Sequence, residues 1–147
     1  MGDTLAPIET CCACYTLRCQ PRTDLTSDEG TLPPLTRYVD STHSLNHRIR
    51  QHQTGIGSRF TRTHPVLEDN GVEAVNLDYR ATSEQVLRYE NDTTIELMYK
   101  FMEQYSHPQA WRCVASGSYC KFDLRQPMPA ALRQRLDAHP VTHGDDA

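Results

Sequence analysis

The chain has 147 residues, a net charge of -4 and a mean hydropathy of -0.65, and 37% of its residues are hydrophobic. This size suits one small domain, and the negative charge argues against binding nucleic acid through charge alone. No apolar run is long enough to span a membrane, and no secretory leader is evident. We therefore expect reduced cysteines and a cytoplasmic location without membrane contact.

Residues 1–81 show no sustained apolar periodicity, so we expect them to form an extended, largely irregular arm. Four cysteines lie within nine residues of this arm: Cys11, Cys12, Cys14 and Cys19. Thiolates bind zinc, but structural zinc sites commonly use two well-separated pairs of ligands. We interpret the four as plain reduced cysteines, with a zinc site as the alternative. The Met1-Gly2 start, with cysteines nearby, leaves lipid modification as a further alternative.

Residues 41–65 contain no acidic residue, although the chain as a whole is acidic. Arginine pairs with carboxylates in bidentate fashion, so we expect an acidic partner surface to bind the four arginines of this segment. They are Arg48, Arg50, Arg59 and Arg62. Ser44–Gln53 predicts a short helix, which Gly55 and Gly57 end. A turn is expected at residues 68–71 because Asn70-Gly71 favours positive φ.

Residues 82–124 have the highest density of large apolar side chains, and we expect them to form the ordered core. Thr82 and Gln85 have the spacing of a capping box, which predicts a short helix. Thr93 and Glu96 repeat that spacing and predict a second, longer helix that ends before Pro108.

Alternating side chains then predict a β-hairpin, with one strand at Trp111–Ala115 and the other at Tyr119–Leu124. A short helix is expected from Ala130 to Asp137, followed by a flexible acidic tail over residues 139–147. The predicted fold is thus a small α+β unit over residues 82–138, with two helices, a β-hairpin and a closing helix. Cys113 and Cys120 are expected to be packing residues.

A series of short motifs surrounds the end of the longer helix. They are Phe101-x-x-x-Tyr105, Pro108, Trp111-Arg112-Cys113 and Gly117-Ser118-Tyr119. This order resembles the eight-kilodalton dynein light chain family, in which a helix ending in Phe-x-x-x-Tyr leads to Trp-His-Cys and then to a Gly-Ser-Tyr strand. The chain departs from the family after Leu124, where the aromatic C-terminal strands have no counterpart.

The resemblance implies a non-enzymatic structural or adaptor protein. Members of that family bind extended peptides by adding a strand to a sheet edge, within dynein and other cytoskeletal assemblies. It implies partner contacts at Gly117, Ser118 and Tyr119, and an axonemal or microtubule-associated location in a cilium or flagellum. Tubulin or dynein components are then the expected partners, with tubulin's acidic surface suited to the arginines.

Two alternatives belong to other functional classes. The first is a zinc-binding or nucleic-acid-contacting module that uses the cysteine cluster. The second is an enzyme with Cys113 or Cys120 as its nucleophile and His107 nearby. No enzyme motif is present in the sequence, so we expect no catalytic activity and no cofactor.

Overall fold

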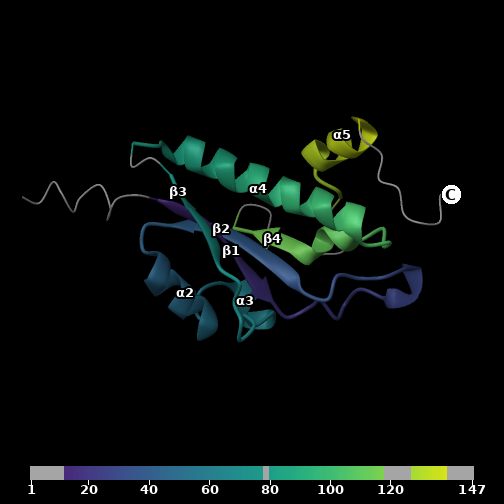
Figure 1. Cartoon of the computed structure of the whole chain (residues 1–147), viewed down its shortest axis with the longest axis horizontal. Helices are drawn as coiled ribbons and strands as arrows, with labels where there is room; N and C mark the ends of the chain where they lie inside the picture. The colour runs from purple at the N-terminus through teal and green to yellow at the C-terminus, as the bar shows by residue number, and fades with distance from the viewer. Residues whose placement is uncertain (1–11, 78–79, 118–126, 139–147) are drawn as a thin grey trace, which may run out of the picture.

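The computed structural model describes residues 12–77, 80–117 and 127–138 and confirms the α+β class (Figure 1). Its centre is a four-stranded sheet with the strand order β3-β1-β2-β4. Strand β1 (Ala13–Cys19) pairs antiparallel with β2 (Thr36–Thr42) and with β3 (Glu73–Asn76). Strand β4 (Val114–Ser116) runs parallel to β2. Helix α4 (Ser83–Gln104) covers one face of the sheet, and α2 (Leu45–Gln53) and α3 (Arg59–Thr63) lie on the other.

The cysteine-rich segment is a central strand of the sheet. In β1, every residue except Arg18 is buried. Successive side chains of a strand point to opposite faces, so Cys14 packs in the cluster under α4, whereas Tyr15 and Leu17 pack in the cluster on the α2 and α3 side. Residues 13–76 thus supply three of the four described strands, which corrects the expectation of an irregular arm over residues 1–81.

Helix α4 is one continuous helix rather than the two predicted. The capping box at its start is present, because Thr82 accepts from the backbone of Gln85 and the Gln85 side chain accepts from the backbone of Thr82. The second predicted start, at Thr93, lies in the middle of the helix. The neighbouring Thr94 donates its hydroxyl to the carbonyl of Glu90 at 2.8 Å, a bond that threonine makes inside a helix.

The predicted hairpin is also corrected. Its first strand is shortened to β4, because the tryptophan belongs to the short 3-10 helix η3 (Ala110–Cys113). The residues of its second strand, 119–124, lie outside the described residues, as does the tail 139–147. A parallel partner requires a crossover connection. The chain between β2 and β4 contains α2, α3 and β3, and α4 then crosses from β3 to β4.

Two further elements agree with the sequence. Helix α2 begins after Ser44, as predicted, and α5 (Ala130–Ala138) matches the predicted closing helix. Leu132 of α5 is fully buried in the cluster around α4. Arg135 of α5 pairs with Glu96 of α4 at 2.6 Å and lies 4.4 Å from the ring centroid of Tyr99. A single 3-10 turn, η2 (Ser27–Glu29), precedes β2.

We expect Trp111→Ala to lower the free energy of unfolding by about 3–5 kcal/mol, because truncation of a buried aromatic leaves a cavity. Trp111 is only 7% exposed and lies in the cluster between α4 and the sheet. Leu87→Ala is the matched control, since Leu87 is 48% exposed and should change stability by no more than about 0.5 kcal/mol. Urea denaturation of both variants measures the difference. Equal stability of the two variants would contradict the assignment of Trp111 to the core.

Candidate functional site

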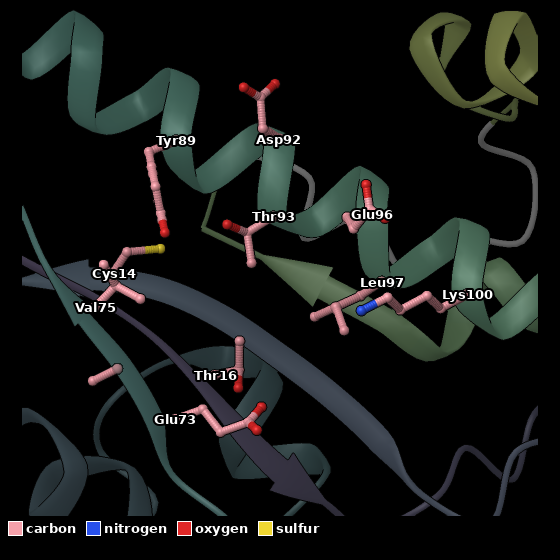
Figure 2. A pocket seen from close by; sticks show the side chains of 11 residues that line it. Cys14, Thr16, Glu73, Val75, Tyr89, Asp92, Thr93, Glu96, Leu97 and Lys100 are labelled. Carbon is pink, nitrogen blue, oxygen red and sulfur yellow. The ribbon is translucent and has the colours of Figure 1, made fainter.

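The candidate site is a groove of about 470 Å³ between α4 and the β1–β3 half of the sheet (Figure 2). Its floor comes from the strands: Cys14, Thr16, Glu73, Ala74 and Val75. Its wall comes from successive turns of α4: Tyr89, Asp92, Thr93, Glu96, Leu97 and Lys100. The volume lies in the range typical of ligand-binding pockets.

Apolar surface in the groove is exposed on both sides. Val75 on the floor is 48% exposed and Tyr89 on the wall is 38% exposed. Leu97 is half-buried and points from α4 towards the sheet. These side chains offer an apolar surface that a ligand in the groove would cover.

Two of the four charged side chains that line the groove are already paired. Glu73 forms an ion pair with Arg37 at 2.9 Å, and Glu96 pairs with Arg135 of α5. Among the described residues, Lys100 has no ion pair, and Figure 2 shows its amino group extended beside Leu97. The groove therefore combines an apolar middle with one available cation.

The structure separates the cysteines that were considered as zinc ligands. Cys14 packs on the α4 side of the sheet and Cys19 on the opposite face, while Cys12 immediately precedes β1. Burial raises the pKa of the Cys14 thiol to about 11 and that of Cys19 to about 12, which disfavours the thiolate that zinc requires. In the described ranges, no three potential ligands gather around one point. Cys11 lies outside those ranges.

Cys113 and His107 do not form a nucleophile and base. Cys113 is 1% exposed, and burial raises its pKa to about 12. His107 uses both ring nitrogens: Nε2 lies 2.7 Å from the carbonyl oxygen of Thr26, and Nδ1 accepts from the backbone N–H of Gln109. Both side chains therefore serve packing. Cys120 lies outside the described residues.

The four arginines predicted to bind a partner are not equivalent. Arg48 turns inwards, where it pairs with Asp40 at 3.4 Å and donates to Gln51. Arg50, Arg59 and Arg62 are exposed on α2 and α3. The structure thus leaves three of the four side chains available to a partner.

The predicted contact at residues 117–119 is described only in part. Gly117 follows β4 and donates its N–H to the carbonyl of Val39 at 3.3 Å. A Cβ atom at Gly117 would lie 3.2 Å from Asp40 Oδ1 and 3.5 Å from Glu90 Oε1, so a side chain would crowd the carboxylate of Asp40 and be in ordinary contact with that of Glu90. Ser118 and Tyr119 lie outside the described residues.

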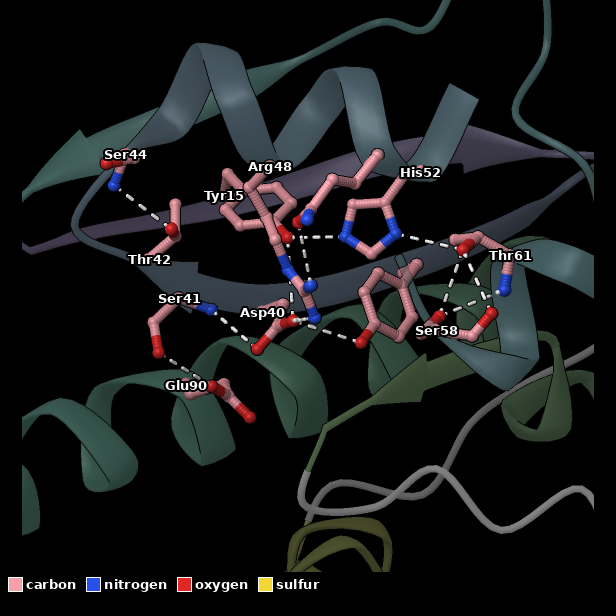
Figure 3. Close-up of polar contacts among 12 residues, drawn as sticks. Tyr15, Asp40, Ser41, Thr42, Ser44, Arg48, His52, Ser58, Thr61 and Glu90 are labelled. Atoms are coloured by element: carbon pink, nitrogen blue, oxygen red, sulfur yellow. Dashed lines mark hydrogen bonds and ion pairs between the residues drawn. The ribbon is translucent and has the colours of Figure 1, made fainter. Parts of the chain in front are cut away.

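A buried polar network joins α2 and α3 to the sheet (Figure 3). Nε2 of His52 lies 2.7 Å from the hydroxyl of Tyr15, and Nδ1 lies 2.9 Å from the hydroxyl of Thr61. The Tyr38 hydroxyl donates to Asp40 at 3.1 Å. Both nitrogens of His52 are therefore occupied and the ring is only 1% exposed. This arrangement holds layers together and leaves no nitrogen for a substrate.

Sequence reasoning missed both the groove and the network. Residues 72–75 read Val-Glu-Ala-Val, which is a short apolar patch without strict alternation, so the sequence predicted no strand there. The burial of His52 had one signal, because His52 lies on the same side of the predicted helix as Leu45 and Ile49, but the surrounding segment is polar and rich in arginine and histidine.

Comparisons with known proteins gave no match: no family model, no curated protein and no solved structure resembles the chain significantly. The dynein light chain resemblance consequently stays a hypothesis that rests on the motifs alone. Of the helices in the described part of the chain, none combines the length and apolar character needed to cross a bilayer.

We expect acid to weaken the fold through His52. Burial, and next the charge of Arg48, lower its pKa from about 6.5 to about 4, so the unfolded chain takes up the proton first. The free energy of unfolding should therefore fall as the pH drops from about 6.5 towards 4, by up to about 3 kcal/mol.

Denaturant unfolding across this pH range measures the effect. His52→Gln should be less stable near neutral pH but lose less stability on acidification than the parent. The control His47→Gln changes an exposed residue and keeps His52, and therefore keeps the pH dependence. A His52→Gln variant with the same pH dependence as the parent would rule out this origin.

Proposed function

We propose that the protein is a non-enzymatic adaptor subunit that binds an extended segment of a partner protein by strand addition along β3. The observation that carries this proposal is the exposed sheet edge beside the groove. All four residues of β3 are exposed, and within the described chain the strand pairs only with β1. Such an edge presents unpaired N–H and C=O groups to an incoming strand.

The register identifies the outward-facing backbone groups. The N–H of Leu77 donates to the carbonyl of Cys12 at 2.7 Å, and Cys14 lies opposite Val75. Hydrogen-bonded and non-hydrogen-bonded pairs alternate in an antiparallel ladder. The backbone of Val75 therefore bonds to β1, and the N–H and C=O groups of Ala74 and Asn76 point away from it.

The groove supplies the side-chain contacts for the same segment. In an added strand every second side chain would face the α4 side, where Val75, Tyr89 and Leu97 expose apolar surface. Burying one large apolar side chain there would contribute about 1.5–3 kcal/mol. An acidic residue near the end of the segment would meet Lys100. In strand addition, main-chain hydrogen bonds usually supply the affinity and side-chain pockets supply the specificity.

The kind of assembly is proposed from the motif resemblance. Dynein light chains bind extended segments by strand addition, and β3 offers that same mode in this chain. We therefore propose a subunit of a cytoskeletal assembly, with dynein components or tubulin among its neighbours, in the cytoplasm or an axoneme. The edge used here is β3, while the resemblance points to the chain after β4, at the opposite edge of the sheet.

Ala74→Pro should abolish peptide binding while leaving the fold intact. Proline removes the outward N–H of residue 74, and proline is tolerated on edge strands because the ladder to the neighbouring strand keeps its bonds. The probe is a set of peptides selected from a random displayed library against the purified wild-type protein. We expect at least about a tenfold loss of affinity, which corresponds to about 1.4 kcal/mol.

The matched control is Ala74→Thr, which keeps the N–H and suits a strand. Its affinity should stay within about twofold of the parent, a difference below about 0.5 kcal/mol. Selected peptides that bind Ala74→Pro as tightly as the parent would place the peptide site elsewhere. A library that yields no binder would equally count against the proposal.

A further inference from the structure

The loop between α2 and α3 presents an isolated apolar side chain to solvent. Ile56 is 73% exposed, which makes it the most exposed large hydrophobic residue in the described part of the chain. Along the chain it lies between Arg50, in the last turn of α2, and Arg59, in the first turn of α3. Single exposed hydrophobic residues are common on protein surfaces, but this one has a hydrogen-bonded backbone and arginines on both sides of it in the chain.

The loop is fixed by bonds to α2. The N–H of Ile56 donates to the carbonyl of Gln51 at 3.0 Å, and the N–H of Thr54 donates to the carbonyl of Arg50 at 3.1 Å. Gly57 lies against the buried ring of His52, where an added Cβ atom would overlap Nδ1. The backbone of Ile56 is therefore held in place, and little backbone entropy is lost when a partner binds there.

The charges around Ile56 are cationic and uncompensated. Arg59 and Arg62 lie three residues apart on α3, so they share one side of that helix. Within the described residues, no carboxylate forms an ion pair with Arg50, Arg59 or Arg62, whereas the neighbouring Arg48 is held by Asp40. Residues 41–65 contribute no acidic side chain of their own.

We propose that Ile56, Arg50, Arg59 and Arg62 form a second docking surface, the Ile56 surface, for an acidic protein segment that carries an apolar residue. The apolar residue packs on Ile56, and the carboxylates around it pair with the arginines. The net charge of -4 opposes long-range attraction of an acidic peptide and of a phosphate backbone alike, so the apolar contact at Ile56 is what favours a protein segment over nucleic acid. Single-stranded nucleic acids are also held by stacking on aromatic side chains, which an isoleucine does not offer.

The Ile56 surface is independent of the groove. Figure 1 shows α2 and α3 on the sheet face opposite α4, so both surfaces are accessible at the same time. The proposal does not require peptide binding at β3. If the β3 proposal and the Ile56 proposal both hold, the protein binds two partners, one on each face of its sheet.

The test uses a synthetic peptide of glutamates interrupted by two phenylalanines, titrated into the labelled full-length protein. Ile56→Ser should weaken binding about tenfold, or about 1.4 kcal/mol. Combined replacement of Arg50, Arg59 and Arg62 by glutamine should abolish binding. Added salt should weaken binding to the parent. Leu87→Ser and Arg88→Gln, which change exposed residues of α4, are the matched controls and should bind like the parent.

Three further probes decide the nature of the partner. A peptide with serines in place of the phenylalanines should bind at least about tenfold more weakly, because it lacks the apolar contact. Tighter binding of a single-stranded oligonucleotide, or of vesicles containing phosphatidylserine, would overturn the assignment to a protein segment. If the acidic peptide does not bind, or if Ile56→Ser does not change its binding, the proposal that the Ile56 surface is a docking site is overturned. The variant Ala74→Pro should bind the acidic peptide normally, so failure of the groove proposal is seen separately.

Discussion

The arrangement of this protein depends on how much of a sheet one helix can cover. An α-helix with its side chains is about 10–12 Å across, and neighbouring strands are about 4.8 Å apart, so one helix covers about two strands. Helix α4 packs mainly on β2 and β4. On that face, β1 and β3 extend beyond the helix, and α5 packs against α4 itself. The groove of about 470 Å³ is the part of this face that α4 leaves open.

The opposite face of the sheet is covered in a different way, because two short helices, α2 and α3, share it. Phe60 of α3 stacks on Tyr38 with ring centroids 5.4 Å apart, and Ile49 of α2 packs in the same cluster. Polar groups beneath these helices are satisfied by the network around His52, and a fully bonded buried network is compatible with a stable, specific core. The same network fixes the ring of His52. Because Gly57 packs against this ring, the network also positions the loop that carries Ile56.

Sequence reasoning succeeded where local signals were strong. The capping box at Thr82, the proline after α4, and the periodicity of α2 and α5 all act within a few residues. It failed for β1, because Cys14 and Cys19 suggested metal ligands while a strand buried on both faces shows no alternation. It divided α4 at Thr93, because a hydroxyl followed by glutamate forms the same pattern inside a helix as at its start.

The candidate sites were harder to predict from the sequence than the helices and strands. Val75 and Leu97 are separated along the chain, and only strand pairing and helix packing bring them to the two sides of one groove. The arginine segment was recognised from composition, but composition could not show that Arg48 bonds to Asp40 while Arg50, Arg59 and Arg62 stay exposed. The proposed role of Ile56 likewise depends on a loop that is fixed by hydrogen bonds. No sequence motif predicts these bonds.

The most direct test of the central claim, that the β3 edge and its groove are open in the free protein, is amide hydrogen exchange resolved by NMR. The N–H groups of Val75 and Leu77 bond to β1 and should exchange slowly, because they open only with the sheet. The N–H groups of Ala74 and Asn76 point outwards and should exchange at nearly the rate of an unstructured peptide. Equal protection of all four amides would show that another segment already covers the edge, and would contradict the account.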